Sequence, residues 1–194
     1  MSDEVVLPRR AVPQPRPAVC AGGDCGACCL GGLLGLPIPA VYHRLRKDAE
    51  AFTFHDMRQA LWSAGGMLDR IVEETPIWVP CRWPRAPWGI PGPDLVPHWF
   101  GYLRMAVDAG YYGLAEVHHA GGGYPEETDH WVLLCGAREV EPPPGGGAIL
   151  QQVLVSCPAS SPEGRWVDAG DLLLKHGAYS ALLARPAPVA ILPP

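Results

Sequence analysis

The apolar residues in the first half of the chain recur at the spacing of helices. The clearest pattern is an apolar run over residues 27–36, which predicts a short buried helix that starts at Cys25 and ends near Gly35. In later segments the apolar positions recur every three or four residues, as on a helix with one buried face. Three more helices are expected: residues 38–46, with Val41 and Leu45 on one face; residues 53–65, with Met57, Ala60 and Leu61; and residues 98–109, with Phe100, Leu103, Met105 and Val107.

The second half of the chain changes to short apolar runs bounded by glycine, proline or polar residues, a pattern typical of strands. The run HWVLLC, from His130 to Cys135, is closed by a glycine and predicts a buried strand. The other expected elements are strands over residues 113–119, 148–156 and 179–184 and a short helix over residues 168–176. Helices come first and strands second, so the predicted fold class is α+β, with N-terminal helices packed on a C-terminal antiparallel sheet.

Proline and glycine, 23 residues each, are more frequent than in an average protein. Residues 1–17, where proline alternates with charge, are expected to form a loosely ordered arm ahead of a single domain over residues 18–194. Residues 142–147 predict a connection between two strands. Residues 76–97 are rich in proline and tryptophan, and they predict either a loop held to the surface by its indole rings or one wall of a substrate cleft.

The net charge of −5 gives no electrostatic reason to expect a nucleic-acid partner. The first ten residues are acidic and then basic without an apolar core, so no secretory signal is expected. The longest apolar stretch, residues 27–41, is interrupted by Pro37 and Pro39, so no membrane span is expected. Seven cysteines is an odd number in a chain without an export signal, which favours reduced thiols in the cytoplasm over a disulfide framework. No pattern indicates a cofactor or an oligomeric state.

The segment GGDCGACCL, residues 22–30, places Cys25 between glycines and directly before the first predicted helix. At the first turn of a helix, unpaired backbone N–H groups and the positive end of the dipole favour an anion such as a thiolate. This environment lowers the pKa of a cysteine, so Cys25 is a candidate nucleophile. The alternative is a small buried cysteine in a tight turn.

A nucleophilic thiol needs a base, and His130 is the leading candidate among seven histidines. It stands at the first position of a predicted buried strand, so a rigid element would aim it. His118 and His119, at the end of a strand before a glycine loop, are the other candidates that could reach a cleft. His43, His55 and His98 fall in predicted helices among charged residues and are expected to be surface or packing residues.

Three motifs occur in order along the chain: Asp24-Cys25-Gly26-x-x-Cys29-Leu30, His130 to Gly136, and a strand that ends Val155-Ser156-Cys157-Pro158. Together with the helical segment 53–65 they resemble the papain-like peptidases that process bacteriocin precursors at double-glycine leaders, and their stand-alone relatives. The resemblance spans about residues 18–185. It implies a papain-like fold, Cys25 as nucleophile, His130 as general base, and a peptide or protein substrate cut after small residues such as glycine.

Two positions differ from the pattern of the family. Where the family has a glutamine that completes the oxyanion hole, this chain has Val19, and where it has an aspartate that orients the histidine, this chain has Cys157. A thiol is a weaker acceptor than a carboxylate, so Cys157 is expected to orient His130 less firmly, with Ser156, Asp168 or a backbone carbonyl as alternatives. A slow, specific enzyme and an inactive relative are both compatible with these changes.

Other functions could use the same residues. Clustered cysteines can bind zinc, but the spacing C-x4-C-x2-C-C, which starts at Cys20, is not that of a standard zinc site. Cys28 and Cys29 are then expected to be small buried residues. An inactive papain-like domain would act as a peptide- or protein-binding module. The same Cys–His pair also serves an amide acyltransferase, because water or an amine can resolve an acyl-enzyme. The favoured hypothesis is a cysteine peptidase that cleaves a peptide or isopeptide bond.

Overall fold

The structure, a computed structural model, describes residues 3–15, 24–45, 54–63, 68–72, 93–117, 130–142, 146–178 and 180–186. In chain order the elements are β1 (Asp3–Val6), α1 (Cys25–Leu34), α2 (Ile38–Leu45), α3 (Phe54–Ser63), β2 (Leu68–Val72), η3 (Pro93–Leu95), α4 (Val96–Asp108), β3 (Tyr112–Val117), β4 (His130–Val140), β5 (Leu150–Cys157), β6 (Ser161–Asp168), the π-helical turn η5 (Asp171–Lys175) and β7 (Ser180–Pro186).

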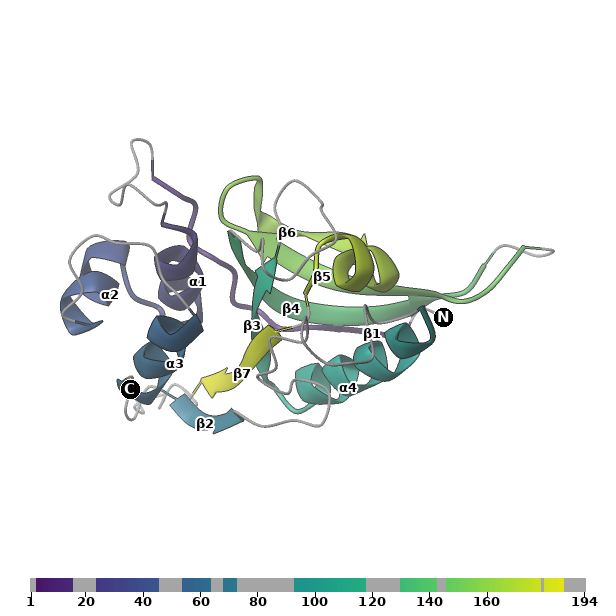
Figure 1. Ribbon diagram of the computed structural model, residues 1–194, viewed down its shortest axis with the longest axis horizontal. Coiled ribbons are helices and arrows are strands. Elements are labelled where there is room, and N and C mark those ends of the chain that lie inside the picture. The colour runs from purple at the N-terminus through teal and green to yellow at the C-terminus, as the bar shows by residue number, and fades with distance from the viewer. Residues whose placement is uncertain are drawn as a thin grey trace, which may run out of the picture.

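Within these residues, seven strands form one antiparallel sheet in the order β2-β7-β3-β4-β5-β6. β4 is long enough to pair with two strands along one edge: its first half pairs with β3 and its second half with β1. Helices α1, α2 and α3 gather on one side of the sheet, and α4 lies along its other face (Figure 1). The α+β class predicted from the sequence is therefore confirmed.

Alternating residues of β4 divide the core into two layers. Trp131 and Leu133 pack against α1, α2 and α3, whereas Val132 and Leu134 pack against α4 on the opposite face. This is the side-chain alternation of a strand buried on both faces, which reads in the sequence as a continuous apolar run. His130, at the start of the same strand, is therefore held by a rigid element between the two layers.

α1 matches the expected helix closely. It ends at Gly35, which has a φ of 70° and supplies the left-handed cap that favours glycine. All but one of its residues are buried, because its small side chains allow close packing. A Cβ on Gly32 would lie 1.9 Å from the carbonyl oxygen of Arg10, so the N-terminal segment runs directly against this helix.

The expectation of a loosely ordered arm is wrong for residues 3–15. Residues 3–6 form β1 in the sheet, and Ala11 is buried in the core. The segment between them crosses from the sheet to α1 by backbone hydrogen bonds: the amide of Leu7 donates to Cys135 (2.8 Å) and that of Val12 donates to Cys28 (3.0 Å). Proline-rich composition predicted disorder, but these bonds satisfy the extended backbone.

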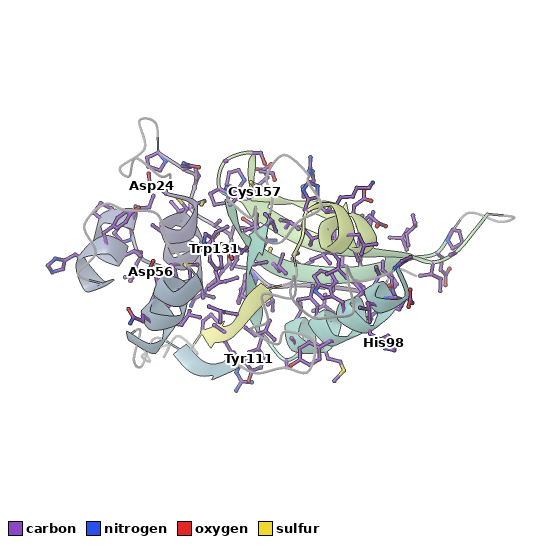
Figure 2. The ribbon with its side chains drawn as sticks, in the orientation of Figure 1. Asp24, Asp56, His98, Tyr111, Trp131 and Cys157 are labelled. Carbon is purple, nitrogen blue, oxygen red and sulfur yellow. The ribbon has the colours of Figure 1, made fainter. Side chains whose placement is uncertain are left out.

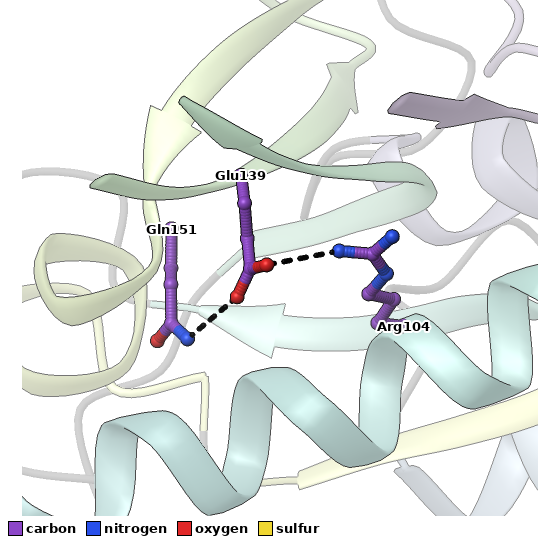
Figure 3. Close-up of polar contacts among 3 residues, drawn as sticks. All are labelled: Arg104, Glu139 and Gln151. Carbon is purple, nitrogen blue, oxygen red and sulfur yellow. Dashed lines mark hydrogen bonds and ion pairs between the residues drawn. The ribbon is translucent and has the colours of Figure 1, made fainter. Parts of the chain in front are cut away.

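Polar side chains tie α4 to the far half of the sheet (Figure 3). Arg104 of α4 forms an ion pair with Glu139 of β4 (3.2 Å), and the same carboxylate accepts a hydrogen bond from Gln151 of β5 (3.3 Å). On the opposite face of the β4–β5 pair, the guanidinium of Arg138 lies 4.2 Å from the ring centroid of Trp166. These contacts fix the extension of β4 and β5 beyond the core.

Three strands were not expected from the sequence: β1, β2 and β6. The predicted apolar face of α4 is correct for Phe100, Leu103 and Val107 but wrong for Met105, which is 68% exposed. The expected face of α3 is confirmed, since Met57, Ala60 and Leu61 are all buried. None of the helices in the described ranges has the length and apolar character needed to cross a bilayer.

Candidate active site

His130 and Cys157 are in direct contact at one end of the sheet. His130 begins β4 opposite Val117, and its Nε2 lies 3.2 Å from the Sγ of Cys157, the last residue of β5. Both side chains are 7% exposed. The register explains the contact: Leu133 pairs with Ser156, so Cys157 faces the position two residues after His130 on the same side of β4.

Cys25 reaches the same imidazole from the helical layer. It is the first residue of α1 and is 8% exposed, and the interaction of its thiol with the His130 ring raises the pKa of that ring. Figure 2 labels Asp24, the residue directly before Cys25 and α1, and Cys157, at the end of β5. The structure thus brings the three residues selected from the sequence around one ring.

The two thiols change the protonation of His130. Burial on its own disfavours the imidazolium, but hydrogen bonds with Cys157 and Cys25 and the attraction of both sulfur atoms outweigh it and raise the pKa of His130 to about 9. The imidazole is therefore protonated at neutral pH. A protonated ring donates from both nitrogens, so it can serve both sulfur atoms at once.

Cys157 is the ionised partner. Burial raises the pKa of this thiol, but the hydrogen bond and charge of His130, the Ser160 side chain and the backbone N–H of Ala159 together lower the pKa to about 6. Cys157 and His130 therefore form a thiolate–imidazolium pair near neutral pH. This is a stronger interaction than the neutral thiol contact expected from the sequence.

Three further thiols in the core are protonated. Burial, then electrostatic repulsion by Asp24 and Cys25, raises the pKa of Cys28 to about 12. Burial also raises the pKa of Cys29 well above its ordinary value and the pKa of Cys135 to about 11. Cys28 and Cys29 are fully buried, which confirms that they are small core residues.

Neither alternative acceptor for His130 takes that role. The hydroxyl of Ser156 accepts the amide N–H of Ala11 (2.9 Å) and donates to the carbonyl of Pro162 (2.6 Å). The carboxylate of Asp168 accepts the amide N–H of Asp171 (3.0 Å). These groups hold the arm and η5 in place, and of the three side chains Cys157 is the one that contacts the ring (3.2 Å).

Asp24 is a buried polar residue of the site whose environment the sequence did not indicate. It is fully buried directly before Cys25, and its carboxylate accepts a hydrogen bond from the hydroxyl of Tyr42 (2.7 Å). A charged residue just before an apolar helix usually caps the first turn, but the Asp24 side chain makes no such cap. Its bond to Tyr42 of α2 instead fixes the entry into α1.

Several expectations fall outside the described residues: Val19, Cys20, His118, His119 and most of the tryptophan-rich segment 76–97. His43 and His98 are exposed, as expected for surface residues. Among the described residues, no three His, Cys, Asp or Glu side chains come together in a group that could hold a metal ion. No protein-family model matches the chain, and no significant match was found among curated proteins or solved structures.

Proposed function

We propose that the protein is a papain-like cysteine hydrolase that cleaves a peptide or isopeptide bond, with Cys25 as nucleophile and His130 as the group that moves protons. The observation that carries this proposal is a single imidazole that contacts the Cys157 thiol and interacts with a second thiol, Cys25, at the first residue of a helix. A nucleophile beside a base that a third group orients is the arrangement of covalent catalysis.

The backbone around Cys25 favours it over Cys157 as the nucleophile. The first backbone bond of α1 runs from the amide of Cys28 to the carbonyl of Asp24 (2.8 Å), so the amides of residues 25–27 have no acceptor within the helix. Amides at the positive end of a helix stabilise the oxyanion that forms when a thiolate attacks a carbonyl. Cys157 ends a strand, and the donors beside it, the Ser160 side chain and the backbone N–H of Ala159, bind its own sulfur.

Because two thiols share one imidazole, the reaction begins with a proton relay. In the resting state Cys157 is the thiolate and His130 is the imidazolium. When His130 returns a proton to Cys157, the ring is free to accept the proton of Cys25, which becomes the thiolate. Attack on the carbonyl carbon then forms an acyl-enzyme, and the imidazolium protonates the departing amine. Water completes hydrolysis, whereas an amine in its place would give acyl transfer.

One observation favours a second candidate, a papain-like domain that binds a peptide or protein without cleaving it. The charge of His130 is already paired with Cys157 at neutral pH, so Cys25 competes with a second sulfur for the same imidazolium. This competition weakens His130 as a base for Cys25. The two candidates differ in turnover but use the same residues.

Turnover of a peptide panel tests the proposal. Peptides that end in Gly-Gly or Gly-Ala before the scissile bond should be cleaved at least about tenfold faster than Leu-Phe peptides, a difference of about 1.4 kcal/mol. Cys25→Ala should abolish cleavage. Cys28→Ala, on the same helix and also buried, is the matched control and should retain it. Binding without turnover of any peptide would favour the binding module, and an added amine that captures the acyl group would indicate a transferase.

A further inference from the structure

A small cavity lies on the side of the sheet that faces α4, next to Cys157. Its volume is about 90 Å³, and His130 and Cys157 are part of its lining, whereas Cys25 is not. Aliphatic side chains from β3, β4, β5, β6 and η5 form part of its walls: Val117, Val132, Val155, Val167 and Leu172. Polar side chains complete the lining: Ser160, Ser161, Arg165 and His176. Cys157 therefore faces a compartment that does not include the proposed nucleophile.

Ser161 gives this cavity a polar group that the described structure leaves unused. Its side chain lines the cavity and is 9% exposed, and among the described residues its hydroxyl has no hydrogen-bond partner. Ser161 pairs with Cys157 across the β5–β6 hairpin, so both side chains lie on the same face of the sheet. The Ser161 hydroxyl can therefore donate to, or accept from, a polar atom of a ligand in the cavity.

We propose that Cys157 and this cavity form a second reactive site, at which a small hydroperoxide oxidises the Cys157 sulfur to a sulfenic acid. The sulfur attacks the terminal oxygen of the peroxide, the S–O bond forms and the O–O bond breaks. The imidazolium of His130 (3.2 Å from the sulfur) gives its proton to the departing alkoxide. Thiolate, imidazolium and hydroperoxide thus become sulfenic acid, neutral imidazole and alcohol, with two electrons passing from sulfur to the peroxide.

The dimensions and chemistry of the cavity select this class of ligand. A cavity of about 150 Å³ lined by apolar residues holds benzene, so one of about 90 Å³ suits a small hydroperoxide and not a peptide. Its aliphatic side chains suit a short alkyl group, and the Ser161 hydroxyl can donate to a peroxide oxygen. The reaction uses His130 and Cys157 but does not involve Cys25, so it can be followed in protein that lacks the proposed nucleophile.

Site-resolved trapping of sulfenic acid tests the proposal in full-length protein that carries Cys25→Ser. The protein is treated with hydrogen peroxide or tert-butyl hydroperoxide, samples are quenched at intervals in denaturant that contains dimedone, and labelling of each cysteine is followed by peptide mass spectrometry. Cys157 should be labelled at least about tenfold faster than Cys135, a buried thiol that does not line the cavity. Equal or slower labelling of Cys157 would overturn the proposal.

Two variants ask whether the cavity itself serves the reaction. Ser161→Ala should slow oxidation by both peroxides about fivefold to tenfold, the loss of one hydrogen bond. Val167→Phe should fill the cavity and slow tert-butyl hydroperoxide more than hydrogen peroxide. Val6→Phe, at an exposed position of β1, is the matched control, and Val167→Leu replaces Val167→Phe if the larger residue lowers the melting temperature. Unchanged rates in folded variants at both positions would overturn the role of the cavity.

Discussion

The Nε2 of His130 lies 3.2 Å from the Sγ of Cys157, and this contact joins the first residue of β4 to the last residue of β5. In the resemblance drawn from the sequence, an aspartate would occupy the place of Cys157. The thiol substitutes for it by becoming an anion, because the pKa of Cys157 falls to about 6 beside the imidazolium. A residue that is neutral in isolation thus supplies the charge that orients the histidine.

This pair predicts a thiolate at unusually low pH. Titration of the native protein at 240 nm, where thiolates absorb, should show one thiolate per chain appearing near pH 6, the pKa of Cys157. Cys157→Ser should remove that step, whereas Cys135→Ser, which removes a thiol with a pKa of about 11, should not. A first thiolate step near the ordinary value of about 8.5 would contradict the ion pair.

The same pair predicts little pH dependence of stability between pH 6.5 and 9. The raised pKa of His130 stabilises the fold fully below pH 6.5, and this contribution is lost as the pH rises through about 9. The lowered pKa of Cys157 contributes fully above pH 9 and is lost as the pH falls through about 6. The opposite slopes cancel. The free energy of unfolding of the native protein and of Cys157→Ser, measured by thermal unfolding, should therefore differ by a constant amount across this range.

Replacing Cys157 should change activity in opposite directions for two substitutions. Cys157→Asp should preserve or raise peptide cleavage, since a carboxylate pairs with His130 without competing with Cys25 for the proton. Cys157→Ala should lower it modestly, because the ring loses its partner at 3.2 Å. Initial rates at pH 7 with a Gly-Gly peptide measure both. An Asp variant less active than the Ala variant would show that the position does not orient the ring.

Two glycines in helices should respond to alanine with opposite signs. Gly32→Ala would place a Cβ 1.9 Å from the Arg10 carbonyl oxygen, so it should lower the free energy of unfolding by about 2–3 kcal/mol. Gly101→Ala in α4 meets nothing within 4 Å and should raise it by about 0.5–1 kcal/mol. Urea unfolding measures both. A neutral Gly32→Ala would mean that the N-terminal segment does not pack on α1 in solution.

Ser156→Ala should destabilise the fold by about 1–3 kcal/mol, since it leaves the buried amide of Ala11 without its acceptor and the carbonyl of Pro162 without its donor. A truncation that removes residues 1–15 should not be additive with it, because both remove the same contact. A double-mutant cycle by urea unfolding tests this. Full additivity would show that Ser156 and the arm act independently.

The helices and the buried strand β4 could be predicted because their apolar positions follow a simple period. β6 escaped prediction since it is an edge strand that contains Pro162 and Gly164, and its exposed positions need no apolar residue. β1 was not predicted because the segment DEVV carries two acidic residues. Its place in the sheet depends on pairing with β4, which local sequence does not encode.

The site residues Cys25, His130 and Cys157 could be selected from motif order and residue type. The charge state of His130 and Cys157 could not be predicted, because it depends on burial and on a distance of 3.2 Å between residues 27 positions apart. The roles of Asp24 and Ser161 depend in the same way on tertiary neighbours. Sequence therefore predicted which side chains meet, and the structure was needed to assign their charges.

The most direct test of the account is the identity of the cysteine that a peptide electrophile modifies. A Gly-Gly acyloxymethyl ketone, too large for the cavity beside Cys157, should add once per chain, and mass spectrometry should find the adduct on Cys25 alone. His130→Ala should slow this reaction by at least about a hundredfold, while Cys28→Ala should leave it unchanged. An adduct on Cys157, or no adduct on folded protein, would contradict the assignment of Cys25 as the nucleophile.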